Sequence, residues 1–320
     1  MAAPGSAPGF ASGSASGSAS GSARAAASGS APARFEPNLM RRKLKGTVFL
    51  GLSLLAVGVL LLTLVVLLWD ILSRGLPWLD TQFLTGTPSR RAERAGVLPA
   101  LVGSIEIALL VGLITFPVGV AAAIHLEEYA TDSRFNRLLR TNIANLAGVP
   151  SIVYGIFGLA LFVRGLGLGF TLLAGALTLS LLILPVVIIA SMEALRAVPR
   201  AQREAAFALG GSRWQVVRGS VLPAAGPGIL TGIILAMARA IGETAPLILV
   251  GAVTFVTFLP NPIASGYTVL PIQIFQWAGD PREDFQSLAA AAITVLMTLM
   301  LVLNAAAIVI RARLSRHLTW

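Results

Sequence analysis

The feature that most constrains this chain is a series of long apolar runs that contain almost no charged residues. The run from Thr47 to Trp69 holds no Asp, Glu, Lys or Arg. At about 1.5 Å per residue, a helix over this run is about 35 Å long and crosses the hydrocarbon core of a bilayer. Further runs follow at 101–124, 143–163, 170–192, from about 228 onward, and 288–310. The sequence therefore predicts an all-α, polytopic membrane bundle of about six transmembrane helices.

Composition and charge narrow the class of protein further. Only 12% of the 320 residues are charged and 56% are hydrophobic, whereas a soluble domain has about 25% charged residues. The net charge of +10 could suggest nucleic acid, but the basic residues lie in short segments between apolar runs, without an aromatic and basic stripe. We expect no nucleic-acid partner. With no cysteine and two isolated histidines, His125 and His317, we expect no disulfide framework, metal or cofactor.

The chain divides into four parts along its length. Residues 1–45 are rich in Gly, Ala and Ser and end in a basic cluster; they bury too little apolar surface to fold, which predicts a disordered cytoplasmic tail. A first transmembrane helix is expected over 46–72. Its basic flank resembles a signal peptide, but the run is too long and lacks a small-residue cleavage site, so we expect it to be retained. Residues 97–311 form the main transmembrane domain, and 312–320 a cytoplasmic C-terminus.

The distribution of basic residues predicts the orientation in the membrane. With the N-terminus in the cytoplasm, most of the 24 lysines and arginines fall on the cytoplasmic side, and the C-terminus is cytoplasmic as well. The segment 73–100 then lies outside. A short apolar stretch from Tyr267 to Trp277 also lies outside, with Pro271 near its start. It is too short to span and is expected to be interfacial or re-entrant.

The longest cytoplasmic loop, residues 199–223, has a defined helical pattern. Glu204 to Leu209 indicates a short helix, which Gly210 stops. Ser212 can cap a second helix, with Gln215 three residues later completing a capping box. A helix, a glycine turn and a second helix on the inner membrane surface are typical of a docking element.

The second of these helices is expected to place Trp214, Val217 and Val221 on one face and to end at Leu222–Pro223. In the first helix, two small alanines allow a partner to approach closely, and Phe207 supplies an apolar anchor.

The loop resembles the EAA loop of ABC importer permeases, in which Glu-Ala-Ala is followed after three residues by Gly and after nine more by Ile-x-Leu-Pro. Ser220 departs from this pattern, because it stands where Ile is usual. The resemblance implies a type I ABC importer permease fold and a coupling helix that binds a cytoplasmic ATPase. The residues matched to that role are Glu204, Ala205, Ala206, Phe207 and Gly210.

Three further stretches, 125–130, 145–155 and 239–246, resemble the phosphate ABC importer permeases of the PstA type. This resemblance covers about 41–316. It implies transport of phosphate by alternating access in a bacterial inner membrane. It also implies three partners: a second permease of the PstC type, an ATPase dimer and an extracytoplasmic phosphate-binding protein.

The sequence predicts no enzymatic activity in this chain. The only lysines, Lys43 and Lys45, have no glycine-rich loop before them, and no G-x-x-x-x-G-K-[ST] motif occurs. ATP hydrolysis is therefore expected in a partner chain.

Two charges are predicted inside the fifth span. A charge such as Arg239 near the middle of the bilayer costs about 2.5–3.5 kcal/mol on insertion scales, so it should face the bundle interior with a partner. Glu243 is one helical turn further on. Either the two only neutralise each other, or Arg239 meets phosphate in the translocation pathway while Glu243 restrains it in the empty state.

Two more residues are candidates for the pathway. Glu106, in the second span, is expected to pair with Arg239, to pair with a partner subunit, or to line the pathway. Arg164, before a Gly-rich turn at the outer mouth of the third span, is expected either to gather anions or to anchor the helix end.

Two other functions remain open from the sequence. One is an ABC importer permease for another anion, such as sulfate or molybdate. The other, from a different class, is a stand-alone channel or ion-coupled transporter, which would need no docking loop.

Overall fold

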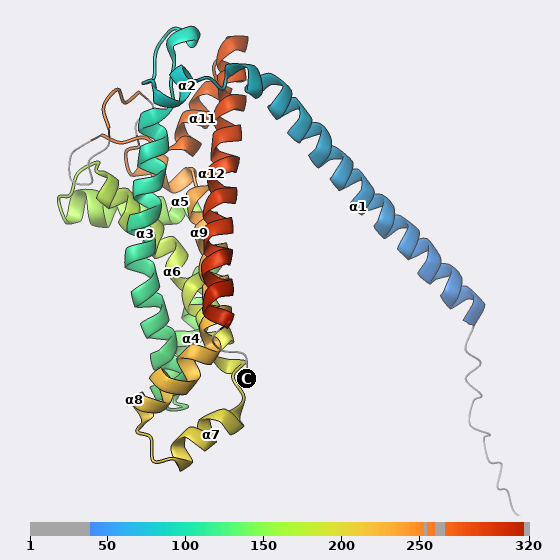
Figure 1. Ribbon diagram of the computed structural model, residues 1–320, viewed down its shortest axis with the longest axis vertical. Coiled ribbons are helices and arrows are strands. Elements are labelled where there is room, and N and C mark those ends of the chain that lie inside the picture. The colour runs from blue at the N-terminus through green and yellow to red at the C-terminus, as the bar shows by residue number, and fades with distance from the viewer. Residues whose placement is uncertain (1–38, 253–254, 260–265, 317–320) are drawn as a thin grey trace, which may run out of the picture. The chain divides into compact units, whose positions relative to one another are not determined.

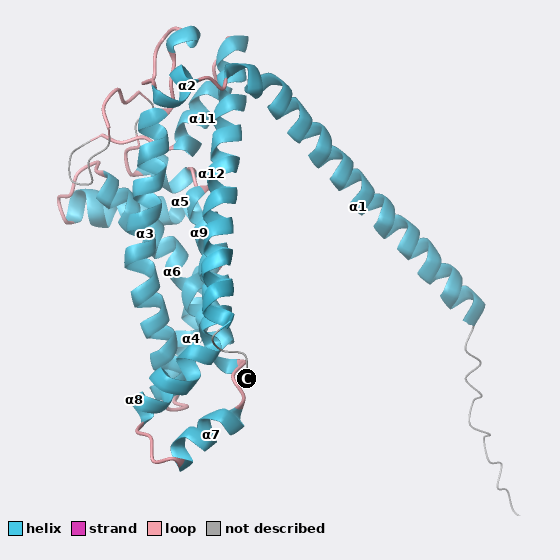
Figure 2. Cartoon of the chain, viewed as in Figure 1, coloured by secondary structure: helices cyan, strands magenta, loops and turns pink. Residues whose placement is uncertain are grey.

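The computed structural model describes residues 39–252, 255–259 and 266–316. Within these ranges all regular secondary structure is helical, apart from a single isolated bridge between Ala252 and Tyr267 (Figure 2). The part of α1 before Leu61 belongs to one compact unit, and the rest of the described chain forms another. The tail predicted to be disordered, before residue 39, lies outside the described residues.

Helix α1 spans Leu39–Gly75, 37 residues. It begins before the predicted boundary at residue 46, because the Lys and Arg residues of the basic cluster are good helix formers and extend the span on its N-terminal side. The portion Lys43–Trp78 is long and apolar enough to cross a membrane.

Four further helices qualify as membrane spans: α3 (Leu98–Ile124), α6 (Leu172–Arg196), α9 (Leu222–Ile241) with the residues that lead into it, and α12 (Glu283–Arg316). They lie side by side in the second unit (Figure 1). The described chain thus has five candidate spans, or up to six if one bent pair of helices counts as a span. The prediction of an all-α bundle of about six spans is confirmed at this level.

The bent pair replaces the continuous helix predicted over 143–163, which is wrong. Helix α4 (Arg134–Ala147) ends before Gly148, and α5 (Ser151–Gly158) continues as π-helix to Gly165, at an angle of 102° to α4. Pro150 causes the break, because it has no N–H to donate and disfavours helical backbone at the residue before it.

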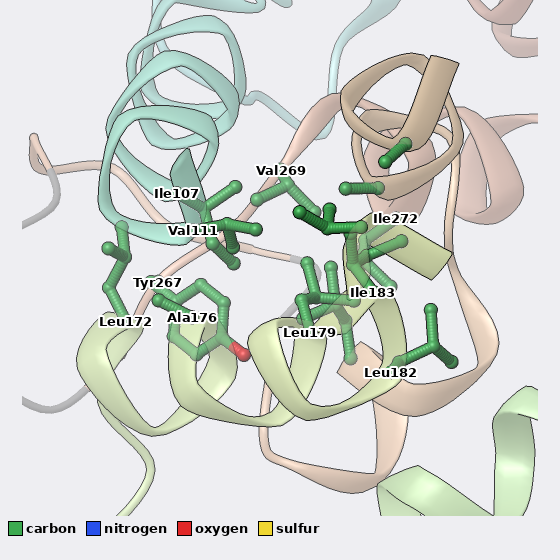
Figure 3. Packing of buried hydrophobic residues seen from close by; sticks show 14 residues of the cluster. Ile107, Val111, Leu172, Ala176, Leu179, Leu182, Ile183, Tyr267, Val269 and Ile272 are labelled. Carbon is green, nitrogen blue, oxygen red and sulfur yellow. The ribbon is translucent and has the colours of Figure 1, made fainter. Parts of the chain in front are cut away.

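Helix α6 is the centre of the bundle and the most buried of the spans. Figure 3 shows Leu179 and Ile183 of α6 packed with Ile107 and Val111 of α3 and with the ring of Tyr267. Small residues bring neighbouring helices close, as is usual between membrane helices. A Cβ on Gly232 of α9, for example, would lie 2.3 Å from that of Ala190 in α6.

Four short helices lie at the two ends of the bundle. At one end, the α11 end, lie α2 (Thr81–Thr85) and α11 (Leu270–Ala278); at the other, the α7 end, lie α7 (Arg200–Ala208) and α8 (Arg213–Val216) (Figure 1). The rings of Phe83 and Trp277 lie 6.0 Å apart at the α11 end. With nine residues, α11 is too short to span a bilayer, which agrees with the prediction for the stretch Tyr267–Trp277.

Candidate functional site

The segment 199–223 folds largely as its sequence predicts. Helix α7 ends at Ala208, and the chain turns at Gly210, whose φ of +81° is a left-handed conformation that favours glycine. The predicted capping box is present at the start of α8: the Ser212 hydroxyl accepts from the Gln215 N–H at 3.5 Å, and Gln215 Oε1 accepts from the Ser212 N–H at 2.8 Å. We call residues 199–223 the coupling segment.

The predicted end of the second helix at Leu222–Pro223 is wrong. A π-helical turn at Val217–Val221 joins α8 to α9, and the Leu222 N–H donates to the Val217 carbonyl. Pro223 therefore falls in the first turn of α9, directly after this π-helical turn. The chain runs on as helix into the span.

The predicted common face of Trp214, Val217 and Val221 is also wrong. Val217 and Val221 are buried together with Val216, but Trp214 is exposed. Trp214 lies in α8, before the π-helical turn that holds Val217 and Val221, and its side chain is 54% exposed.

The coupling segment displays large apolar side chains on its outer surface. Leu209 is 90% exposed, and Phe207 and Trp214 are about half exposed. Glu204 and Ala205 are exposed beside them, while Ala206 is half-buried. An exposed apolar patch of this kind is typical of a surface that meets another protein or a membrane.

Arg203 anchors α7 to the rest of the molecule. Its Nε and Nη2 donate to Glu128 Oε1 at 3.2 and 2.8 Å. Its Nη1 and Nη2 also donate to the carbonyls of Val198 and Leu195, at 2.6 and 2.7 Å. Charge-assisted bonds of this kind hold a short helix firmly, so the patch on α7 has a fixed position.

Glu128 and its neighbour Glu127 are functional candidates that the sequence analysis missed, because it used them only as part of a family resemblance. They lie in the π-helical turn His125–Tyr129 that ends α3. The signal was present as two adjacent carboxylates after an apolar run, with arginines in the neighbouring polar segments.

The second candidate region is a break after α9, which we call the helix break. The fifth span was predicted to contain both Arg239 and Glu243, but α9 ends at Ile241, and α10 (Ala245–Leu249) begins after a turn. Arg239 is therefore in the last turn of α9 and not ten residues into a continuous span, and Glu243 lies in the turn. Pro246 in the first turn of α10 fits this break.

Arg239 and Glu243 do form a pair across the break. Arg239 Nε lies 3.3 Å from Glu243 Oε1, with the Arg239 side chain 46% exposed and that of Glu243 17% exposed. Among the described residues, this is the single hydrogen bond of the Arg239 side chain. Nη1 and Nη2 of its guanidinium therefore make no hydrogen bond to the described residues.

Two of the stretches that carry the family resemblance meet at the helix break. Helix α5 packs so closely on α10 that a Cβ on Gly155 would lie 2.8 Å from Pro246 Cα. The hydroxyl of Tyr154 donates to the Leu146 carbonyl at 2.8 Å and so ties α5 to α4 across their bend.

The other two pathway candidates do not join this pair. Within the described chain, Arg239 has its ion pair with Glu243, and none links it to Glu106. Glu106 Oε2, in α3, is buried with no hydrogen-bond partner among the described residues. Arg164 is exposed in the π-helical end of the bent pair, and no ion pair to another described residue is found for it.

The family described as binding-protein-dependent transport system inner membrane component matches residues 115–319. The chain belongs to this family. Its candidate surfaces are thus those of a permease: the coupling segment at the α7 end and the helix break both lie inside the matched region.

The alignments to several curated relatives extend over most of this permease. It is 38% identical over 265 residues to "Phosphate transport system permease protein PstA" of Haemophilus influenzae, with 82% of this chain and 92% of the relative covered. It is 37% identical over 299 residues to "Phosphate transport system permease protein PstA 1" of Mycobacterium tuberculosis strain H37Rv, covering 89% and 94%.

Solved structures show the same fold at low sequence identity. A chain of a bacterial ABC transporter involved in the import of alginate has a TM-score of 0.59 at 14% identity, covering 86% of this permease and 98% of that chain. A chain of the inward-facing MetNI methionine ABC transporter has a TM-score of 0.58 at 16% identity, covering 68% and 95%. The predicted fold of a type I ABC importer permease is confirmed.

Proposed function

We propose that this chain is the permease subunit of an ATP-driven phosphate importer in a bacterial inner membrane. It works with a second permease subunit, a cytoplasmic ATPase dimer and an extracytoplasmic phosphate-binding protein, and both of its termini are cytoplasmic. The observation that carries the proposal is the coupling segment, a rigidly anchored helix that presents apolar side chains at one end of the bundle. The names of the relatives at 37–38% identity support phosphate as the substrate.

The coupling segment fits a partner that hydrolyses ATP. Phe207 and Leu209 are anchors that a groove on the ATPase would cover, and the small side chains of Ala205 and Ala206 allow close approach. The sequence contains no P-loop motif for binding ATP. ATP therefore acts on this subunit through the movement of α7.

The helix break fits a weak, transient phosphate site. Arg239 commits only Nε to Glu243, so its Nη1 and Nη2 remain for a bidentate contact with phosphate oxygens. Glu243 competes with the ligand for the same guanidinium, which keeps the ion from being trapped. Discontinuous helices commonly form substrate sites in transporters, where backbone groups near the helix ends are free.

Two measurements test the proposal. Purification from native membranes should yield this chain together with an ATPase, a second permease and, on addition, the binding protein. Vesicles containing that complex should accumulate labelled inorganic phosphate when ATP is supplied on the coupling side, and excess sulfate or molybdate should not compete. Co-purification without phosphate uptake would point to a different anion, and ATP-independent uptake without an ATPase would point to a stand-alone transporter.

A further inference from the structure

The end of α3 is a single π-helical turn, His125–Tyr129, whose side chains reach several different parts of the molecule. Leu126 is buried in the core cluster that joins α3, α6 and α9 near the α7 end. The three residues that follow it point to other elements. Turns of this kind are rare and are frequently found at functional sites.

Glu127 holds two helices to this π-turn. Its Oε1 accepts from Nη1 of Arg140 in α4 at 2.9 Å and from Nη2 of Arg196 at the end of α6 at 2.7 Å. Arg140 also donates to the carbonyl of Leu126. The Glu127 side chain is only 11% exposed, so this pairing is much less screened by water than a surface ion pair.

Glu128 and Tyr129 hold the coupling segment to the same turn. Glu128 binds Arg203 of α7 through two hydrogen bonds. The guanidinium carbon of Arg213, the first residue of α8, lies 5.8 Å from the centre of the Tyr129 ring, a cation–π contact. Successive residues of one turn thus contact the bundle, through α4 and α6, and the coupling segment, through α7 and α8.

The contacts continue from α4 to the helix break. Near the end of α4, the Leu146 carbonyl accepts the hydrogen bond of Tyr154. Tyr154 lies next to Gly155, where an added Cβ would lie 2.8 Å from Pro246 Cα in α10. Packing and hydrogen bonds therefore run from the coupling segment through α4 and α5 to α10, which follows the proposed phosphate site.

We propose that the π-turn transmits movement of the coupling segment to α4 and the helix break, with Glu127 and Glu128 as the positioning residues that connect its two sides. The inference rests on the proposed function, since it requires an ATPase that moves α7. Two carboxylates on adjacent residues of one turn move together. Separating largely buried ion pairs is costly, so a displacement of α7 carries Glu128, and with it Glu127 and α4, instead of being absorbed locally.

The test is the number of phosphate ions imported per ATP hydrolysed, measured with the complete transporter and its binding protein in vesicles. In Glu127→Gln we expect this ratio to fall about ten-fold, because the charged contact is lost and α4 is held to the turn more weakly, through the Arg140 bond to the Leu126 carbonyl. The ATPase should still co-purify, since Arg203 continues to hold α7. A partly misfolded sample lowers both rates equally and leaves the ratio unchanged, so the ratio separates transmission from folding.

Further variants define the route. Arg140→Gln removes only the contact between the turn and α4, and it should also lower the ratio. This variant tests the same contact if Glu127→Gln assembles poorly. Glu127→Asp, which keeps the charge, should recover much of the ratio. The matched control is Asp132→Asn, which removes an exposed ion pair to Arg137 (3.5 Å) just beyond the turn and should keep the ratio of the unchanged protein.

Glu128→Gln should also lower the ratio, and the double variant with Glu127→Gln should be no worse than the more severe single change, because both act on one route. A normal ratio in Glu127→Gln and Arg140→Gln, or additive effects of Glu127→Gln and Glu128→Gln, overturns the inference alone. If the unchanged complex imports no phosphate with ATP, the proposed function fails, and the inference with it.

Discussion

Arg203 and Arg239 are the two arginines on which the candidate regions depend, and they are used in opposite ways. Arg203, in the coupling segment, makes four hydrogen bonds, to a carboxylate and two carbonyls, and is only 20% exposed. Arg239, at the helix break, makes one bond of 3.3 Å and is nearly half exposed.

The difference distinguishes an arginine that builds the structure from one that is available to a ligand. A guanidinium with most of its N–H groups hydrogen-bonded fixes the position of a helix. A guanidinium held at one nitrogen is oriented and can still bind a ligand through the others. A transporter needs both. The coupling segment has to move as a rigid piece, and the pathway has to bind its ion and then release it.

The largest expected effect is at Arg239. Arg239→Gln should lower phosphate uptake about a hundred-fold, since a bidentate charged contact is worth a few kcal/mol, while the complex still assembles and binds its ATPase. The measurement is uptake of labelled phosphate into vesicles, with co-purification as the assembly control. Uptake at the normal rate would mean that the Arg239–Glu243 pair serves only to hold the helix break together.

The second effect concerns the apolar patch on α7. Leu209→Ser should weaken binding of the ATPase about ten-fold, which corresponds to about 1.4 kcal/mol, because a covered Leu side chain loses its apolar contact. The fold of the permease should not change, as Leu209 is almost fully exposed. Titration of the purified ATPase onto the permease complex measures this effect. Full affinity in Leu209→Ser would place the docking surface elsewhere.

The packing behind the helix break gives a smaller effect. Gly155→Ala should destabilise the permease by about 1–3 kcal/mol, because the new Cβ would meet the backbone of Pro246 at 2.8 Å. The matched control is Gly51→Ala in α1, where a Cβ meets nothing within 4 Å. Thermal unfolding in detergent compares the two. Equal melting temperatures would show that α5 and α10 separate without cost.

The smallest effect should come from an exposed ion pair at the α11 end. Hydrogen bonds from Arg282 lower the pKa of Asp280 from its usual 3.8 to about 2. Because the pKa is depressed in the folded state, the stabilisation is fully present above about pH 4 and is lost as the pH falls through about 2. Asp280→Asn should therefore lower the melting temperature only slightly at pH 7, and by the same amount at pH 5.5. A difference between those two pH values would contradict this assignment.

The sequence predicts well those features that depend on residues close together in the chain. The apolar runs of α3, α6 and α12 indicate spans because each carries its own signal of length and hydrophobicity. The glycine turn at Gly210 and the cap at Ser212 follow from local backbone rules.

It predicts poorly those features that depend on how distant segments meet. Glu127 and Arg196 are 69 residues apart, and nothing in the spacing of either indicates that they pair. The sequence predicts one continuous helix over 143–163, because membrane helices often tolerate proline. The bend at Pro150 is therefore not foreseen. The exposure of Trp214 depends on which face of α8 meets the core, and the π-turn after it shifts that face.

The exposure of Leu209 also has a consequence for the life of the protein in the cell. Under the proposed function, a newly made subunit without its ATPase partner exposes this apolar side chain to the aqueous phase, where chaperones and proteases act on incompletely assembled proteins. We expect orphan copies to be cleared faster than assembled ones. Leu209 would then also help to keep the amount of the permease matched to the amount of its ATPase.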